Sequence, residues 1–454
     1  LSDPWTLRLQ PPACVTDQQC ARLMNGLLDV CGILRDGQLA TLARFLESER
    51  SDISGERSPA CDAPARDDAV DATLAQAPRA ESHTAAQRIP SRRAALRDGW
   101  RLCAFDSRSF ERDQRDVPAR RVAWLCHMVD SDDLTLQDAS LRVIPLERRE
   151  RLLDSLAPLA TPIVMSGVDV RSLTGDVVRL YPIMLPFTSR MAREWLDARD
   201  FELCHELIRG GLAIASELGC SLASLGQYTS ILSGAGAALR GAGIRLTSGN
   251  SYTVALAVEA IERAMETRGI EPSRSTLAIA GAVGNIGSIC AEILASRFER
   301  TVLLSRDRPG HRRRVEVLAA AMPRASVGTK REALQDAHVV VSAISDVDAP
   351  FGAADFRDSA IVCDVSVPAS VRRETLVARP DLLVFKGGLA RIPGDVDLRI
   401  ASYPLPGTQA FGCLAEALLL GLENVDTDEF TGPVTVDKVV RTRRWAEKHG
   451  FSLV

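Results

Sequence analysis

The chain has little that would tie it to a membrane, to nucleic acid or to a metal. No uninterrupted apolar run approaches the roughly 20 residues of a membrane span. No basic segment followed by an apolar one marks a secretory leader at its start. The formal net charge is only −4, with 55 Lys and Arg against 59 Asp and Glu, so charge gives no reason to expect nucleic acid. The 6 histidines show no metal-ligand spacing, and a metal site is not expected.

The 11 cysteines also lack a pattern, because they form no C-x-x-C pair and no Cys/His cluster. An odd count fits no complete disulfide framework, so we expect a reducing, cytoplasmic environment. Most of these cysteines lie in apolar runs and are interpreted as small buried side chains. Cys413 differs in its setting. Pro406 and Gly407 break the chain before it, Thr408 can cap a helix, and an apolar helical run follows.

This setting puts Cys413 in or near the first turn of a helix. Unpaired backbone N–H groups and the positive end of the helix dipole favour thiolate over thiol there. A thiolate is a good nucleophile toward an activated acyl group. The residues alone leave open a second interpretation, in which Cys413 is a buried core cysteine.

Composition divides the chain into segments. Residues 1–47 carry apolar positions at near-helical spacing and are expected to be helical. Residues 48–95, rich in Ser, Ala, Pro, Asp and Arg, predict a flexible linker. Residues 1–47 fit either a tail from an upstream domain or an element that docks a carrier protein. The remaining segments are a mixed α/β domain at 96–268, a Rossmann-type domain at 269–403, and C-terminal helices at 404–454.

Patterning within these segments predicts an α/β fold. A buried strand is expected at 121–129 and short strands with turns at 163–185. Long helices are expected at 146–159 and 191–218, and C-terminal helices at 408–423 and 436–449. The overall fold class is therefore a Rossmann-type parallel-sheet domain, preceded by a mixed α/β domain and followed by a helical C-terminal segment.

Short apolar strands begin to alternate with helices from residue 276. Expected strands lie at 276–280, 301–304, 339–342 and 360–364, which predicts a parallel sheet with right-handed crossovers. A glycine-rich loop, Gly281-Ala-Val-Gly284-Asn-Ile-Gly287, follows the first strand and opens a helix that is expected to reach about residue 297.

The glycine loop predicts a dinucleotide site. Gly281 permits the tight turn, Gly284 the close approach of the pyrophosphate, and Gly287 the close packing of helix on sheet. The helix N-terminus then faces the phosphates. The predicted cofactor-binding residues of this loop are Gly281, Val283, Gly284, Asn285, Ile286 and Gly287.

The end of the second strand indicates which nicotinamide cofactor binds. An acidic residue there would accept the ribose hydroxyls of NAD, but the chain has Ser305-Arg306-Asp307-Arg308. Ser305 can hydrogen-bond a 2′-phosphate and Arg306 can pair with it, which predicts NADPH. Because ligands bind at the carboxyl ends of such strands, Ser342, Ser345 and the stretch 364–366, with Val365, should also line the cleft.

Five segments in the same order resemble the aldehyde-forming long-chain acyl-acyl-carrier-protein reductases that feed alkane biosynthesis. The likeness runs from about residue 122 to 454 and leaves out residues 1–95. The segments are Thr247-Ser-Gly-Asn-Ser-Tyr-Thr253, Gly281 to Ser288, Phe385-Lys-Gly-Gly388, Phe411-Gly-Cys-Leu-Ala-Glu416 and Lys448-His-Gly-Phe451.

The resemblance implies an acyl-binding α/β domain, a central Rossmann domain for NADPH, and an acyl group carried on Cys413 as a thioester. It implies that the substrate is a thioester of acyl carrier protein or of coenzyme A. The stretch 225–230 matches a further loop near the cleft, in which Gln227-Tyr228 replaces the usual Gly-Phe pair and so alters the acyl tunnel. Gly412 also replaces the commoner Ala. The site residues that the resemblance adds are Thr247, Gly249, Asn250, Thr253, Tyr228 and Gly388.

A nucleophilic cysteine and a nicotinamide cofactor on one chain predict the reduction of a thioester to an aldehyde. Two alternatives stay open: a dehydrogenase of a small acid or alcohol in which Cys413 is structural, and a non-catalytic NADPH-binding module of a larger assembly. His449 and His205 are candidate proton donors, and Lys386 could approach the nicotinamide or a phosphate. Each of these three also fits an ordinary core or surface position.

Overall fold

The computed structural model of the protein describes residues 120–454, apart from 138, 159, 161, 166, 307–308, 329–331, 348–349, 399, 401–402 and 404. The helical segment expected at 1–47 and the linker expected at 48–95 lie outside the described residues. The stretch 138–160 belongs to a separate unit of the chain. It contains the 3-10 helix η1 (Ala139–Val143) and α7 (Leu146–Leu156), where a helix was expected. The other unit holds the rest of the described residues.

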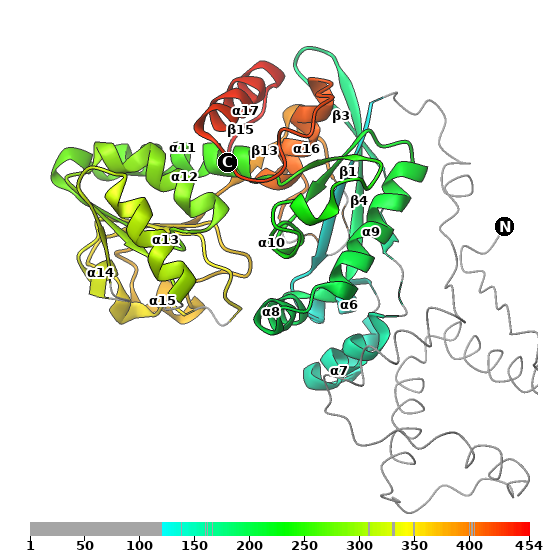
Figure 1. Cartoon of the computed structure of the whole chain (residues 1–454), viewed down its shortest axis with the longest axis horizontal. Coiled ribbons are helices and arrows are strands. Elements are labelled where there is room, and N and C mark those ends of the chain that lie inside the picture. Colours follow the sequence, from blue (N-terminus) through cyan, green and yellow to red (C-terminus); the bar gives the residue numbers. More distant parts are fainter. Residues whose placement is uncertain are drawn as a thin grey trace, which may run out of the picture. The chain divides into compact units, whose positions relative to one another are not determined.

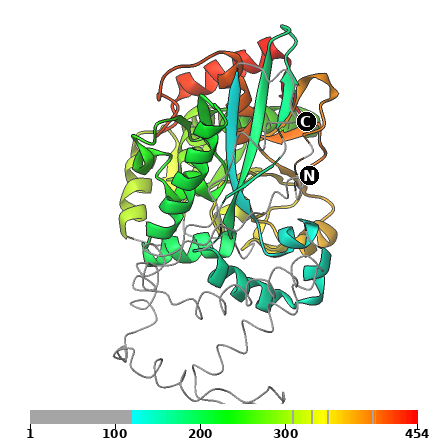
Figure 2. The ribbon, with the colours of Figure 1, turned by 90° about the vertical axis from the view of Figure 1, so that its right-hand side faces the viewer.

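The first half of that unit is built on a mixed six-stranded sheet, sheet A. Its strand order is β2-β4-β1-β5-β6, with β3 also paired to β4. Strand β1 is parallel to β4 and to β5, while β2 and β3 run antiparallel to β4. Figure 2 shows β1 and the long β4 side by side. The strands are β1 (Arg121–Met128), β2 (Ile163–Val164), β3 (Val168–Arg171), β4 (Val177–Thr188), β5 (Leu222–Leu225) and β6 (Arg245–Thr247).

Strand β1 confirms the strand predicted at 121–129, but the prediction for 163–185 was wrong in part. Two short strands are present there, and the rest forms the 12-residue β4, which is buried at almost every position. Strand β4 lies between β1 at one edge and β2 and β3 at the other, so both of its edges are paired. Its continuous apolar run is therefore that of a central strand rather than of several short strands.

Helices cover sheet A, and one of them leads on to the next sheet. The single helix predicted at 191–218 is two helices, because Arg199 adopts a left-handed conformation (φ 53°) that ends the first. Thr188 caps that helix by accepting a hydrogen bond from the Met191 N–H. These helices are α6 (Asp132–Gln137), α8 (Ser189–Ala198), α9 (Glu202–Glu217), α10 (Tyr228–Leu232) and α11 (Asn250–Arg268).

Sheet B is a parallel six-stranded sheet with the order β12-β11-β10-β7-β8-β9. This is the Rossmann order, with the glycine loop directly after the central strand β7. The four strands expected from 276 onward are confirmed as β7 (Thr276–Ala280), β8 (Arg300–Leu304), β10 (Val339–Ser342) and β11 (Ile361–Asp364). The sheet also contains β9 (Ala325–Val327) and β12 (Leu383–Lys386), which were not predicted.

The helices of this half follow its strands in alternation, as the pattern predicts. They are α12 (Asn285–Leu294), α13 (Pro309–Ala320), α14 (Glu332–Gln335) and α15 (Arg373–Ala378), with the short 3-10 helices η3 (Pro272–Arg274), η4 (Ala295–Arg297) and η5 (Ala353–Asp355). The domain boundaries predicted after residues 268 and 403 stay predictions. Sheet A ends at residue 247 and sheet B begins at residue 276.

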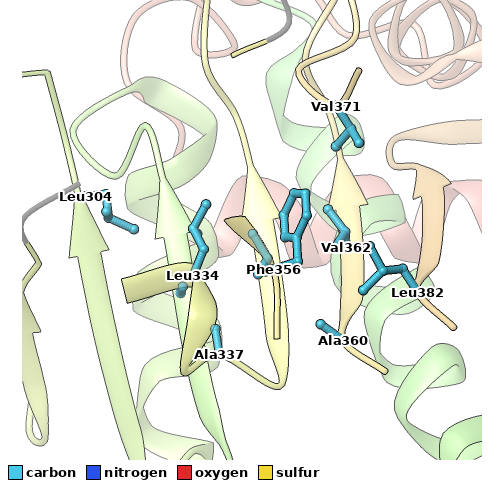
Figure 3. Close-up of a cluster of buried hydrophobic side chains, with 10 residues drawn as sticks. Leu304, Leu334, Ala337, Phe356, Ala360, Val362, Val371 and Leu382 are labelled. Atoms are coloured by element: carbon cyan, nitrogen blue, oxygen red, sulfur yellow. The ribbon is translucent and has the colours of Figure 1, made fainter. Parts of the chain in front are cut away.

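One face of sheet B carries a compact apolar core (Figure 3). Val340 of β10 is the register partner of Ala278 in β7 and of Val362 in β11, so the three side chains share one face. Leu334 and Phe356 cover them. Burying such side chains contributes about 1.5–3 kcal/mol each. The core thereby fixes the strands whose carboxyl ends form the site.

The C-terminal region adds two helices and a small antiparallel sheet of order β14-β13-β15. Helix α16 packs against β1, β4 and β5, and α11 lies against both α16 and α17 (Figure 1). No described helix is both long and apolar enough to cross a membrane. The elements are β13 (Leu389–Arg391), η6 (Pro393–Asp395), β14 (Gln409–Phe411), α16 (Gly412–Leu422), α17 (Val436–His449) and β15 (Ser452–Leu453).

The helix at 436–449 is confirmed, but the prediction that Thr408 caps the cysteine helix was wrong. Strand β14 intervenes, and α16 begins only at Gly412, after Phe411, with no side chain capping its first turn. The Thr408 carbonyl instead accepts the Ile392 N–H, as part of the small sheet. Cys413 is still in the first turn of a helix, as expected.

Candidate functional site

A cavity of about 1140 Å³ brings the glycine loop and Cys413 together. Its wall includes Gly281 and Gly284 from sheet B, Asn250 and Thr253 from α11, and Cys413 from α16. Ligand sites in proteins commonly have volumes of about 300–1,000 Å³. The cavity is therefore large enough for a dinucleotide together with part of a second molecule.

The glycine loop forms a cradle that larger side chains would fill. A Cβ on Gly281 (φ 82°) would lie 2.3 Å from the Ala343 carbonyl oxygen, and one on Gly287 would lie 2.4 Å from the Gly281 carbonyl oxygen. Helix α12 starts at Asn285 with no side chain capping its first turn. Its free N–H groups and dipole fit a pyrophosphate, so these residues suit a dinucleotide.

The predicted residues of this loop divide into two groups. Val283, Asn285 and Ile286 line the cavity, whereas Gly287 lies beneath the loop and does not. The Asn285 side chain is held in place, because it donates to the Gly432 carbonyl at 3.2 Å and accepts the Val434 N–H at 2.9 Å. Asn285 thus links the cofactor loop to the C-terminal region.

Positive charge lies at the end of β8. Ser305 and Arg306 both line the cavity, as predicted, while Asp307 lies outside the described residues. Arg306 donates to the Ser345 carbonyl, and Arg193 of α8 donates to the same oxygen at 2.8 Å. Arg314 donates to the Val283 carbonyl at 2.7 Å. Guanidinium groups therefore gather near the end of β8, and those of Arg306 and Arg314 belong to residues that line the cavity.

The carboxyl ends of the other strands meet the cavity only in part. Ser345, Val365 and Gly388 line it, as predicted. Ser342 does not, because it is fully buried and accepts a hydrogen bond from the Ser370 hydroxyl at 2.7 Å. Asp364 is also buried, and its carboxylate accepts the backbone N–H groups of Ser366 and Ser370. Ser342 and Asp364 therefore shape the loop after β11 instead of facing the cavity.

Three N–H groups surround the sulfur of Cys413. The Trp124 indole Nε1–H donates to Sγ at 3.4 Å. The backbone N–H groups of Gln227 and Leu414 also bond to Sγ and lower the pKa of the thiol. Burial is the larger effect, however, and raises the pKa of Cys413 to about 11. The expectation that a helix start by itself favours the thiolate is thus corrected. Removing the sulfur from water disfavours the charged thiolate more strongly than the N–H donors favour it.

Gln227 supplies one of these donors from an unusual backbone conformation. Its φ of 53° and ψ of −128° lie in a region that glycine adopts freely and other residues adopt at a cost of about 1–3 kcal/mol. Its side-chain Oε1 accepts the His127 N–H at 3.5 Å. The departure from the usual Gly-Phe pair therefore falls where glycine would be unstrained.

The loop at 247–253 lies directly beside Cys413. Gly249 (φ 70°) touches the cysteine so closely that a Cβ there would lie 2.3 Å from Cys413 Cβ. Asn250 and Thr253 line the cavity, whereas Thr247 and Gly249 do not. A Cβ on Gly412 would lie 2.6 Å from Thr253 Oγ1. This gives a physical reason for glycine at 412, where the resembling family commonly has alanine.

Tyr228 is placed behind the cavity wall. It is fully buried, does not line the cavity, and its ring centroid lies 5.6 Å from that of His127. Its backbone N–H donates to His127 Nε2 at 3.2 Å. Burial raises the pKa of Tyr228 to about 12. Tyr228 thus supports the wall from behind.

Neither candidate histidine reaches the cavity, but the candidate lysine does. His449 is buried with Nε2 2.7 Å from Glu423 Oε1, and His205 Nε2 lies 2.9 Å from the Leu232 carbonyl. Lys386 lines the cavity and donates to the Ser366 carbonyl. Burial lowers the pKa of Lys386.

Sequence reasoning missed the roles of Trp124 and Glu416. Trp124 precedes Cys413 by 289 positions, and nothing in its local pattern indicates a contact with sulfur. Glu416 lies in the same short motif as Cys413, so its spacing of three residues on one helix was the available signal. In the part of the chain that the structure covers, no group of three or more His, Cys, Asp or Glu residues is arranged to hold a metal.

Comparison with known proteins shows distant similarity only. No known family profile matches the chain. It is 27% identical over 309 residues to the long-chain acyl-[acyl-carrier-protein] reductase of Synechococcus elongatus, which covers 64% of this chain and 87% of that protein. It is 28% identical over 252 residues to the aminotransferase PigE of a Serratia species, covering 53% of this chain but only 29% of that protein.

The similar solved structures include dehydrogenases, with low overall likeness. D-2-hydroxyisocaproate dehydrogenase is 10% identical with a TM-score of 0.27, covering 58% of this chain and 77% of that one. Shikimate 5-dehydrogenase of Listeria monocytogenes, in complex with shikimate and NAD, is 16% identical with a TM-score of 0.24, covering 31% and 53%. The Rossmann assignment rests on the strand order and the glycine loop of this chain.

Proposed function

We propose that the protein reduces an acyl thioester to an aldehyde, with Cys413 as the acyl carrier and NADPH as the reductant. One observation carries the proposal: Cys413 lines the same cavity as the glycine loop, with its sulfur beside three N–H donors. A buried structural cysteine would need neither the cavity nor the donors. The distant similarity to an acyl-acyl-carrier-protein reductase supports the same chemistry.

In the first half-reaction, the Cys413 sulfur loses its proton and forms a bond to the acyl carbon. The bond from that carbon to the sulfur of the carrier breaks, and the carrier leaves as a thiol after taking up a proton. The N–H groups of Trp124, Gln227 and Leu414 stabilise the negative charge on Sγ before attack.

In the second half-reaction, the acyl carbon on Cys413 is reduced. When bound, NADPH supplies the hydride. The oxygen takes up a proton to give a hemithioacetal on Cys413. It loses this proton again as the bond from carbon to Sγ breaks, so that the aldehyde leaves and the sulfur takes up a proton to become a thiol. The sum is thioester, NADPH and a proton giving aldehyde, thiol and NADP⁺. Lys386, whose ammonium group lies in the cavity wall, is the described group best placed to supply that proton.

The choice of NADPH is supported by Ser305, by Arg306 and by the neighbouring Arg314. A guanidinium and a hydroxyl are suited to a 2′-phosphate. The proposed substrate is a thioester of acyl carrier protein or of coenzyme A, since both present the same type of thioester bond to Cys413.

The test is intact-mass analysis of the full chain mixed with acyl-coenzyme A and then with NADPH. We expect a mass increase of one acyl group, lost when NADPH is added, with aldehyde released. Cys413→Ala should show no adduct and no aldehyde. The proposal is overturned if no thioester gives an adduct, or if Cys413→Ala oxidises NADPH with a keto acid at the wild-type rate, as expected of a small-molecule dehydrogenase.

A further inference from the structure

A buried carboxylate lies one helical turn after the cysteine. Glu416 of α16 is fully buried. One of its oxygens accepts a hydrogen bond from the Thr247 hydroxyl, and the other accepts the Tyr252 N–H at 2.7 Å. The Ser251 N–H also bonds to the carboxylate. Both oxygens of Glu416 are therefore bound by donors from outside its own helix.

Two of these donors, the Ser251 and Tyr252 N–H groups, belong to a helix that cannot cap itself. Helix α11 has Gly249 at its N-cap, which has no side chain to accept the first N–H groups. The N–H groups of a first turn need acceptors, and negative charge is favourable at that end of a helix. Glu416, which lies on α16, supplies both the acceptors and the negative charge. It thus takes the place of the missing cap.

The same first turn of α11 touches the reactive site. Gly249 is packed against Cys413, and the Thr253 hydroxyl donates to the Gly249 carbonyl at 2.8 Å. Asn250 and Thr253 line the cavity, but Glu416 does not. Glu416 therefore acts on the site from behind the cavity wall, through the residues that it holds and through its charge, which raises the pKa of Cys413.

We infer that Glu416 is a positioning residue, which ties the first turn of α11 to the helix of Cys413 and so fixes where the sulfur lies in the cavity. The inference rests on the proposed acyl transfer to Cys413. It assigns no proton transfer to Glu416. Burial raises the pKa of Glu416 to about 7, and the three donors oppose that rise, in keeping with a group held by its hydrogen bonds.

The experiment compares variants of the full chain. Thr247→Val removes the donor to Glu416, and with it the acceptor of the Gly249 N–H, with little change in volume. Glu416→Gln keeps an acceptor for the Tyr252 N–H, and Glu416→Ala removes the link. Glu423→Gln is the control, because Glu423 ends the same helix and pairs with Lys448 and His449, outside the cavity wall. The readouts are the rate of Cys413 acylation, the KM for the thioester, the rate of alkylation by iodoacetamide, and Tm.

We expect Glu416→Ala to lower the acylation rate about 100-fold, as a displacement of about 1 Å can. Thr247→Val should lower it about tenfold, and Glu416→Gln less than about threefold. Combining Thr247→Val with Glu416→Ala should cost less than the product of the two single losses, because the two residues share one hydrogen bond, while Thr247 alone accepts the Gly249 N–H. The KM should change less than about twofold throughout. Glu423→Gln should lower Tm but leave the acylation rate unchanged.

Acylation at the wild-type rate in both Thr247→Val and Glu416→Ala overturns the inference. An equal loss in Glu423→Gln also overturns it, since the effect would then follow stability alone. If Glu416→Ala does not fold, the acylation rate of Thr247→Val decides the inference. If the wild type forms no acyl adduct at all, the proposed function fails instead. Alkylation then decides the inference, since the iodoacetamide rate must still differ about tenfold between Thr247→Val and the wild type.

Discussion

The indole N–H of Trp124 donates a hydrogen bond to the sulfur of Cys413 at 3.4 Å. This bond favours the thiolate, which burial otherwise disfavours. Trp124→Phe should raise the pKa of Cys413 by about one unit and lower the rate of alkylation by iodoacetamide at pH 8 about tenfold. The measurement is the alkylation rate against pH, followed by intact mass. Trp195→Phe, which alters only a contact with Phe187, is the control, and overlapping profiles for Trp124→Phe and wild type would show that the bond does not affect the thiol.

Gly249→Ala should abolish most activity because of steric overlap with Cys413. The new Cβ would lie 2.3 Å from Cys413 Cβ, so the sulfur has to move, and a shift of about 1 Å can cost about 100-fold in rate. Gly269→Ala is a matched control, since Gly269 also has a left-handed backbone (φ 63°) but no atom within 4 Å of its added Cβ. Gly269→Ala should lose only the roughly 1 kcal/mol of the left-handed backbone. Gly249→Ala should lose more stability because of the overlap, and only Gly249→Ala should lose activity in the folded protein. Equal activities would contradict the close contact.

Gln227 offers a test of backbone strain by two substitutions at one position. Gln227→Ala loses the side chain but keeps the strained φ and ψ, whereas Gln227→Gly also relieves the strain. We expect the glycine variant to be more stable than the alanine variant by about 1 kcal/mol, after allowing for the greater freedom of glycine in the unfolded chain. Urea unfolding measures the difference. The reverse order would mean that this conformation is not strained.

Acidic pH should destabilise the fold through His127. Burial lowers the pKa of His127 to about 4, below the 6.5 or so of an unfolded histidine. The folded state therefore binds the proton less readily, so the contribution is fully present above pH 6.5 and is lost as pH falls toward 4. Between pH 7.5 and pH 5.0 the free energy of unfolding should fall by about 2 kcal/mol from this group. Urea unfolding at the two values measures it.

His127→Gln is the comparison for this pH effect. Its side chain can donate to the Met128 carbonyl and accept the Tyr228 N–H, as His127 does, but it does not titrate. The fall in stability between the two pH values should shrink by about 2 kcal/mol in this variant. An unchanged fall would assign the effect to other groups.

Arg306→Ala should weaken the binding of NADPH and leave the binding of NADH unaffected. The guanidinium lines the cavity at the end of β8, and a charge-assisted bond to a phosphate is worth about tenfold or more in affinity. We expect the KM for NADPH to rise roughly tenfold and that for NADH to change less than about twofold. Arg313→Ala, an exposed position on α13, is the control. An equal rise for both cofactors would place the role of Arg306 elsewhere, for instance in its bond to Ser345.

Local patterns in the chain were sufficient for part of the fold and of the site. Strand β7, the glycine loop and the start of α12 are consecutive, so their periodicity and glycine spacing predict them together. Helix α17 and the place of Cys413 in a first helical turn were predicted for the same reason. By contrast, the length of β4 depends on strands that cover both of its edges, and no local pattern reveals that.

The sequence by itself determined that a dinucleotide loop and a cysteine at a helix start exist on one chain. Only the tertiary structure decided that they share a cavity, that Trp124 and Gln227 face the sulfur, and that Glu416 binds the first turn of α11. The physical reason is the distance along the chain over which the two kinds of interaction act. Helix and turn formation depends on residues a few positions apart, whereas the protonation and position of a buried thiol depend on groups that packing brings from distant parts of the chain.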